Sequence, residues 1–230
     1  MVSRDLKRKI AQMIMVGFPE AEVRGDTPVV RVMKDFGVGG VILYNIDLKC
    51  FVDAQKTNPD LNRIDGARMC PKNIRSPQQL KALTLDLQSF SAEPILIAAD
   101  QEGGMVSRLS PAAGYPPRES HEELGKRDDL SFTSKIAAGI ADDLAAGGIN
   151  LNLAPVVDLS INPESPLFRN GRCFGSDPDV VFRHAMEFIL AHSQRGIRTC
   201  LKHFPGKGSA GKDTHFDLPD ITSVYREEEL

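Results

Sequence analysis

The segment Ile197-Arg-Thr-Cys-Leu-Lys-His-Phe-Pro-Gly206 joins a short apolar run to a glycine-rich loop. The β-branched and apolar residues of this run predict a buried parallel strand over residues 197–201. The strand ends in a Lys-His pair, and the loop that follows carries Asp213 and His215, two positions apart. In barrels and in open α/β folds, ligands bind at the carboxyl ends of the strands. We therefore expect the functional site in this loop.

The same alternation of strand and helix extends through the chain before this segment. Helical spacing and capping residues predict helices over residues 3–15, 28–36, 77–90, 132–146 and 178–195. Apolar runs predict strands over residues 38–43, 94–99 and 149–157 in addition to 197–201. Each predicted strand ends in a polar or ionisable group, which favours a (β/α)8 barrel of the TIM type over an open doubly wound sheet.

Four predicted strands make up about the first half of such a barrel. We therefore expect residues 1–230 to form a partial barrel domain of a longer natural protein. Residues 45–75 interrupt the alternation with a polar, turn-rich stretch that contains Asn58-Pro59 and Asp65-Gly66. A loop of this length is uncommon in a compact domain unless it is functional or mobile, and we interpret it as an insertion.

Composition excludes several classes of function. The 28 basic and 31 acidic residues give a formal net charge of -3, which offers no electrostatic case for binding nucleic acid or an acidic membrane surface. No segment approaches the roughly 20 continuous apolar residues of a membrane span. The basic N-terminus lacks the apolar region of a signal peptide. Composition says nothing about the oligomeric state.

The four cysteines, Cys50, Cys70, Cys173 and Cys200, stand at irregular spacing and form no Cys-x-x-Cys motif. We interpret them as free thiols in a reduced compartment, in preference to disulfides or a zinc site. The sequence thus predicts a cytoplasmic protein.

Two motifs before the glycine-rich loop carry candidate binding residues. Asp100-Gln-Glu-Gly-Gly-Met-Val-Ser-Arg108 places a carboxylate after a predicted strand, where it could accept hydrogen bonds from two vicinal sugar hydroxyls while Arg108 adds a charged donor. A helix cap and a simple turn would explain this motif equally well. Arg172 stands in a turn before a predicted helix, and a surface arginine is the plainer interpretation. Asp158 could be a structural carboxylate at a strand end.

The loop after Lys202 is compatible with three chemistries. His215 could transfer protons near neutral pH, with Asp213 fixing its tautomer. Gly206-x-x-x-x-Gly211-Lys212 resembles a phosphate-binding loop, but the next residue is an aspartate, which would repel phosphate. His203, Asp213 and His215 have the ligand types of a zinc site but no helical histidine pair to anchor it.

Taken together, these motifs resemble glycoside hydrolase family 3. The resemblance rests on four stretches in the family's order: Asp100-Gln-Glu-Gly-Gly with Val106 and Arg108; Asn152-Leu-Ala-Pro-Val-Val-Asp158; Arg172 with Phe174-Gly175; and Lys202-His-Phe-Pro-Gly206 followed by Asp213-Thr-His215 and Leu218-Pro219. The Asp-x-His element further resembles the bacterial β-N-acetylglucosaminidase branch. Met105 and Lys207 depart from that branch, which usually has arginine and a second histidine at these positions.

The resemblance implies a (β/α)8 barrel, retention of anomeric configuration and no cofactor or metal. It implies that His215, held by Asp213, is the acid/base. It assigns contacts with sugar hydroxyls to five residues: Asp100, Arg108, Arg172, Lys202 and His203. The family's nucleophile is an aspartate on a later strand, past Leu230, and a retaining enzyme needs two groups flanking the scissile bond. We therefore expect these 230 residues alone to be inactive.

The predicted function is that of an exo-β-N-acetylglucosaminidase that removes terminal N-acetylglucosamine from cell-wall-type or related glycans, with carbohydrate as its only partner class. Four alternatives stay open: a β-glucosidase or a glycan phosphorylase of the same family, a metal-dependent barrel hydrolase, and a non-catalytic carbohydrate-binding remnant.

Overall fold

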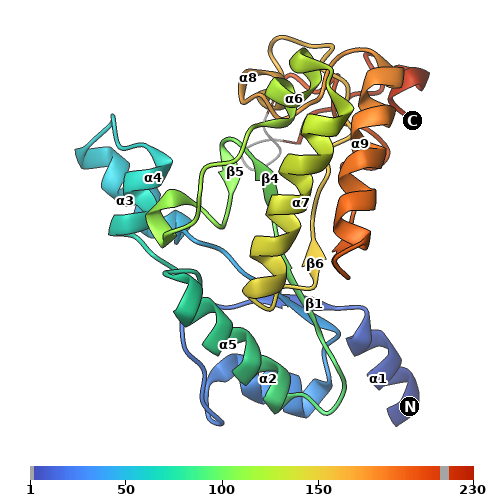
Figure 1. The fold of residues 1–230 in the computed structure, drawn as a ribbon. Helices are drawn as coiled ribbons and strands as arrows, with labels where there is room; N and C mark the ends of the chain where they lie inside the picture. Colours follow the sequence, from blue (N-terminus) through green and yellow to red (C-terminus); the bar gives the residue numbers. More distant parts are fainter. Residues whose placement is uncertain (1–2, 213–217) are drawn as a thin grey trace. The chain divides into compact units, whose positions relative to one another are not determined.

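A computed structural model describes residues 3–212 and 218–230, and these divide into two compact units (Figure 1). The first unit comprises the described residues of Met1–Ala99, Arg108–Pro116 and Asp143–Leu151. The second comprises the described residues of Asp100–Ser107, Pro117–Asp142 and Asn152–Leu230. Strands and helices alternate along the chain in both units, as the sequence predicts.

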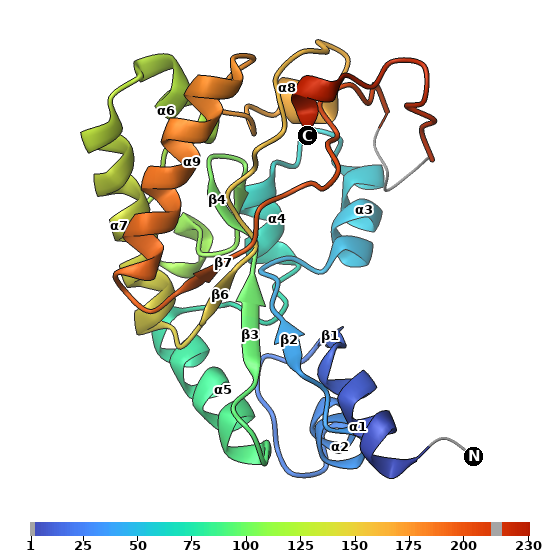
Figure 2. The same ribbon diagram turned by 90° about the vertical axis from the view of Figure 1, so that its right-hand side faces the viewer.

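The first unit is built on parallel strands. Helix α1 (Arg4–Gln12) precedes β1 (Met15–Gly17), and α2 (Pro28–Phe36) leads to β2 (Gly40–Ile42). Helix α5 (Pro77–Phe90) leads to β3 (Leu96–Ala99). The register pairs Met15 with Gly40 and Gly40 with Leu96, and α1 lies beside α2 in Figure 2. The helix predicted over residues 3–15 therefore ends earlier, and its last residues lead into β1.

Local capping explains why α2 and α5 begin where they do. Proline occupies the first position of each helix, where its missing N–H costs no hydrogen bond. The Ser76 hydroxyl accepts a hydrogen bond from the Gln79 amide at 3.2 Å, which caps α5. Gly37 ends α2 in the left-handed conformation, with φ 70°. Both helices match their predicted ranges.

Residues 45–75 are largely helical, so the prediction of a long loop is wrong. Helix α3 (Leu48–Thr57) starts at Asp47, whose carboxylate caps the Cys50 amide, and α4 (Arg63–Met69) starts at the cap Asn62. These helices bury few side chains, chiefly Phe51 and Ala67, and the turn-forming pairs Asn58-Pro59 and Asp65-Gly66 indicate a loop in the sequence. Both contribute to a small apolar cluster.

A disulfide joins Cys50 to Cys70, with 5.7 Å between their Cα atoms. The prediction of four free thiols is therefore wrong for this pair, although buried Cys173 and exposed Cys200 carry free thiols. The spacing of the cysteines in the sequence did not indicate this disulfide, because the two residues are 20 positions apart and meet only when α3 folds beside α4.

We predict that the freshly isolated, denatured protein takes up two equivalents of an alkylating reagent without a reductant and four with one. Mass spectrometry of the intact chain measures the uptake, and peptide mapping should place the unreduced labels at Cys173 and Cys200. Four labels without reductant would show that Cys50 and Cys70 are reduced in the isolated protein.

The second unit contains most of the remaining elements. The hairpin of β4 (Gln101–Gly103) and β5 (Val106–Ser107) precedes α6 (His121–Arg127) and α7 (Leu130–Ala146). Strand β6 (Leu151–Asn152), α8 (Pro166–Arg169), α9 (Pro178–Ser193) and β7 (Arg198–Thr199) follow. Two 3₁₀ turns, η1 (Pro111–Ala113) in the first unit and η2 (Glu227–Glu229) in the second, complete the described elements. Helices α7 and α9 run side by side in Figures 1 and 2.

Hydrogen bonding gives the strand order β1-β2-β3-β6-β7. Strands β6 and β7 are shorter than predicted, partly because Pro155 has no N–H to extend the ladder beyond Asn152. The pairing resumes at an isolated parallel bridge between Val156 and Lys202. Among the described residues no helix is both long and apolar enough to cross a membrane.

Candidate active site

A cluster of two carboxylates and two cations lies in the second unit. The Lys202 ammonium is 2.9 Å from Asp100 Oδ1 and 2.5 Å from Glu102 Oε1. The Arg172 guanidinium grips the same glutamate with two hydrogen bonds, from Nε at 2.9 Å and from Nη2 at 2.8 Å. Only 2% of the Glu102 side chain is exposed, against 14% to 18% for the other three. Glu102 is thus the buried centre of the cluster.

Strand ends bring three of these residues together, and Arg172 joins them from the segment between α8 and α9. Asp100 directly follows β3 and Glu102 lies within β4, while Lys202 lies where the bridge to Val156 continues beyond β7. Strand β4 ends at Gly103, which has φ 99° and at which a Cβ atom would overlap the Glu119 carbonyl oxygen. A side chain at Gly103 is therefore excluded both by the backbone conformation and by space.

The charges of the cluster balance one another. Burial raises the pKa of the Glu102 carboxyl, but hydrogen bonds from Arg172 and the charges of Lys202 and Arg172 outweigh burial and lower that pKa below its usual value. Burial likewise disfavours the charged form of Arg172, and the hydrogen bonds to Glu102 reverse this and raise its pKa. Glu102 therefore stays ionised and holds both cations in place.

His203 forms a second pair, with Asp158. Its Nδ1 atom is 2.5 Å from Asp158 Oδ2, and the Asp158 side chain is fully buried while 32% of the His203 side chain is exposed. Residues near the end of the chain also hold the segment after His203 in place. Glu229 accepts hydrogen bonds from the backbone amide and the hydroxyl of Ser209. Tyr225 adds a hydrogen bond to the Pro205 carbonyl at 2.9 Å.

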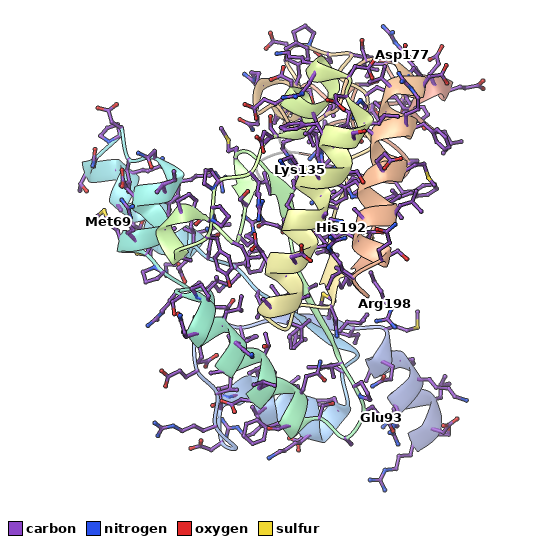
Figure 3. The ribbon with its side chains drawn as sticks, in the orientation of Figure 1. Met69, Glu93, Lys135, Asp177, His192 and Arg198 are labelled. Atoms are coloured by element: carbon purple, nitrogen blue, oxygen red, sulfur yellow. A yellow bond between two sulfur atoms is a disulfide. The ribbon has the colours of Figure 1, made fainter. Side chains whose placement is uncertain are left out.

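Two buried histidines contact residues of the cluster or residues next to them in sequence. His121 Nδ1 is 3.0 Å from the Arg172 carbonyl oxygen, and its ring stacks on Phe174 at 4.2 Å. His192, labelled near the end of α9 in Figure 3, has Nδ1 2.8 Å from the Phe188 carbonyl oxygen and Nε2 3.0 Å from the Asn152 side-chain nitrogen. The Asn152 amide in turn bonds both backbone groups of Gln101, at 3.0 and 2.9 Å.

These contacts fit neutral imidazoles. A ring nitrogen that faces a carbonyl must donate, so Nδ1 carries the proton in both histidines and Nε2 is an acceptor. Burial lowers the pKa of His121 to about 4, and burial likewise lowers the pKa of His192 to about 4. Protonation of His192 at Nε2 would place its new N–H next to the N–H donors of the Asn152 side chain and would remove their hydrogen bond.

We predict acid lability from these two groups. Because the folded pKa of each lies below the unfolded value of 6.5, the unfolded chain binds more protons between pH 6.5 and 4. Their contribution to stability is complete above pH 6.5 and falls as the pH drops towards 4, by roughly 1 kcal/mol per pH unit for each histidine. Urea unfolding at pH 7.0, 6.0 and 5.0 measures the free energy of unfolding. His192→Gln should make this free energy depend less steeply on pH. A free energy of unfolding independent of pH over this range would contradict the prediction.

The structure brings together four of the seven predicted site residues, Asp100, Arg172, Lys202 and His203, within one unit. Arg172 is not the surface residue that its turn suggested. Arg108 belongs to the first unit, where its guanidinium carbon is 5.3 Å from the Tyr44 ring centroid, and its predicted sugar contact stays a prediction. Asp213 and His215 lie outside the described residues, so their predicted role as acid/base is likewise untested.

Sequence reasoning missed the part played by Glu102 and left Asp158 undecided. One pattern could have indicated Glu102: the predicted binding set held three cations, Arg108, Arg172 and Lys202, with Asp100 as its only carboxylate. Buried cations need partners, so a further acid was to be expected in the same motif. No group of three or more metal-ligating side chains occurs within residues 3–212 and 218–230.

Alternating strands and helices, with carboxylates and cations gathered at strand ends, place the protein in the barrel class of α/β enzymes. The chain belongs to glycoside hydrolase family 3, because the model of the glycosyl hydrolase family 3 N terminal domain matches residues 5–229. The family resemblance noted in the sequence is thereby confirmed.

Named relatives agree with this assignment. The chain is 34% identical over 165 residues to beta-hexosaminidase A of Pseudoalteromonas piscicida, covering 69% of this chain and 27% of the relative. It is 34% identical over 157 residues to the beta-hexosaminidase of Photobacterium profundum, covering 68% and 46%. It therefore spans less than half the length of these two relatives.

A solved structure of a glycoside hydrolase family 3 beta-N-acetylglucosaminidase from Paenibacillus sp. str. FPU-7 is similar over 93% of this chain and 36% of that one, with a TM-score of 0.76 and 31% identity. The family's N-terminal domains are of the TIM-barrel type. The prediction of a partial (β/α)8 barrel is confirmed by this likeness and by the parallel sheet.

Proposed function

We propose that the protein is a retaining exo-β-N-acetylglucosaminidase acting on terminal N-acetylglucosamine of cell-wall-type or related glycans. The observation that carries the proposal is the cluster of Asp100, Glu102, Arg172 and Lys202 beside His203, in a chain whose relatives bear the name beta-hexosaminidase. Carboxylates and oriented cations offer acceptors and donors to the vicinal hydroxyls of a sugar.

In this proposal the cluster holds the non-reducing sugar. The Lys202 ammonium has three donors, of which Asp100 and Glu102 take two, so a third can reach a hydroxyl. Asp100, Arg172 and His203 complete the contacts, together with Arg108 by family resemblance. Because the carboxylates already balance Lys202 and Arg172, the described cluster suits a neutral sugar better than an added phosphate.

His215 would protonate the departing glycosidic oxygen and then activate water, with Asp213 orienting its ring. The family's nucleophile, an aspartate on a later strand, has no assigned counterpart among these 230 residues. We expect the 230-residue chain by itself to bind sugar without turning it over. Two groups must flank the scissile bond for retention, and only the acid/base is assigned here.

Product analysis tests this proposal against its alternatives. The product of the complete gene is incubated with an aryl β-N-acetylglucosaminide in phosphate buffer and in a phosphate-free buffer, and the sugar product is identified. Free N-acetylglucosamine at the same rate in both buffers is expected. A sugar 1-phosphate would identify a phosphorylase, loss of activity with a chelator would identify a metal-dependent hydrolase, and binding without turnover would identify a carbohydrate-binding remnant.

The cytoplasmic prediction rested on the N-terminus, which lacks the apolar region of a signal peptide, and on reduced cysteines, and the Cys50–Cys70 disulfide removes the second of these premises. Disulfides persist mainly in oxidising compartments. We propose that the protein works in such a compartment, where glycans of the cell wall are within reach. The alkylation experiment above tests this directly, since a reduced pair in freshly isolated protein would favour the cytoplasm.

A further inference from the structure

Asp158 has contacts that a structural carboxylate at a strand end does not require. Its fully buried side chain accepts three hydrogen bonds from one short turn. Oδ2 takes the His203 backbone amide at 3.2 Å and His203 Nδ1 at 2.5 Å, while Oδ1 takes the Lys207 amide at 2.6 Å. A single carboxylate thus fixes both ends of the turn over residues 203–207 and the ring at its start.

The backbone explains how Asp158 reaches this place. Val156 and Lys202 form a parallel bridge, and the Val157 amide donates to the Lys202 carbonyl at 2.7 Å. Asp158 and His203 therefore leave the paired segment side by side. Gly208 packs against the backbone after Asp158, since a Cβ atom there would overlap the Leu159 carbonyl oxygen.

The contact decides which ring nitrogen carries the proton. An ionised carboxylate can only accept hydrogen bonds, so Nδ1 of His203 is protonated, and in the neutral imidazole Nε2 is an acceptor. The His203 side chain is the more exposed partner of the pair, and it follows directly on Lys202, which contacts Asp100 and Glu102. His203 is thus placed to meet a ligand of that cluster with its acceptor nitrogen.

We propose that Asp158 is a positioning residue that holds His203 in the Nδ1–H tautomer, so that Nε2 accepts a hydrogen bond from one hydroxyl of the bound sugar. The sugar in this statement rests on the function proposed above; the tautomer does not. The site would then select a ligand that donates a hydrogen bond at that position. A ligand whose group at that position can only accept a hydrogen bond would face Nε2, which is also an acceptor, and would bind more weakly.

The tautomer is measured by ¹⁵N–¹H correlation spectra of the histidine rings in the 230-residue chain, with His203→Ala identifying the signals. We expect the Nδ1–H form in the wild-type protein and a shift towards the Nε2–H form in Asp158→Ala, because that variant removes the carboxylate that accepts from Nδ1–H. Asp142→Asn, which removes only an exposed partner of Arg195, should leave the spectrum unchanged. An Nε2–H ring in the wild-type protein would overturn the proposal without any variant.

Ligand binding supplies the second readout. Deoxyfluoro analogues of N-acetylglucosamine at positions 3, 4 and 6 replace a hydroxyl by a group that cannot donate. One analogue should bind the wild-type chain about 10- to 100-fold more weakly than the parent sugar, the worth of one strong hydrogen bond, and Asp158→Ala should reduce this difference in affinity. If the analogue loses the same factor of affinity in the variant as in the wild-type chain, the proposed role of Asp158 in ligand selection is wrong. If the tautomer changes as expected but neither protein binds N-acetylglucosamine, the proposed function fails while the assignment of Asp158 stands.

Should Asp158→Ala fail to fold, Asp158→Glu keeps a carboxylate and should retain the Nδ1–H form. An Nε2–H ring in that variant, if folded, would count against the proposal. The wild-type spectrum remains decisive in either case.

Discussion

His215→Ala should lower the rate of N-acetylglucosaminide hydrolysis by the product of the complete gene by about 10²- to 10⁴-fold, the usual worth of a general acid/base. The loss should depend on the leaving group. An aryl oxygen departs with little protonation, so the variant should form the glycosyl-enzyme readily and then accumulate it. A disaccharide needs its leaving oxygen protonated, so its cleavage should suffer more.

Steady-state rates and the initial burst on both substrates measure these effects. Asp220→Asn is a suitable control, because Asp220 is an exposed residue close to His215 in sequence and bonded to Thr222. It should retain nearly full activity. Equal activity in His215→Ala and the wild-type enzyme on the disaccharide would remove the histidine from the mechanism.

Glu102→Ala should lower the free energy of unfolding by about 3–5 kcal/mol, because it leaves Arg172 and Lys202 with too little negative charge in a largely buried cluster. Denaturant unfolding of the 230-residue chain at pH 7 measures the loss. The matched control is Glu93→Ala, which removes an exposed pair with Arg8 and should cost no more than about 0.5 kcal/mol.

A double variant separates loss of charge balance from loss of packing. Glu102→Leu combined with Arg172→Met removes both members of the bidentate pair and should be more stable than Glu102→Leu alone, since the uncompensated arginine is gone. If Glu102→Ala is no less stable than Glu93→Ala, Glu102 is not the electrostatic centre of the cluster.

Local signals predicted five of the nine α-helices in the described part of the chain: α1, α2, α5, α7 and α9. Proline at the first position and glycine at the end delimit α2, and Ser76 with Pro77 marks the start of α5, because capping depends on neighbours in sequence. Helices α3 and α4 were not predicted, because the pairs Asn58-Pro59 and Asp65-Gly66 indicate turns within this stretch. Strand β1 was not predicted, because its three residues are too few to show a periodic pattern of apolar side chains.

The site was partly predictable for a similar reason. Residue type and motif order identified Asp100, Lys202 and Arg172 as candidates. Their partners could not be predicted, because Lys202 and Asp100 are 102 positions apart and meet only through the fold. The same holds for Asp158 and His203, which come together through the bridge at Val156.

The most direct test of the proposed function compares two substrates. Initial rates of hydrolysis of an aryl β-N-acetylglucosaminide and the matching aryl β-glucoside are measured with the product of the complete gene. We predict fast release of the aryl group from the first substrate and at most slow release from the second. Cleavage of the glucoside alone, or of neither substrate, would contradict the assignment as an N-acetylglucosaminidase.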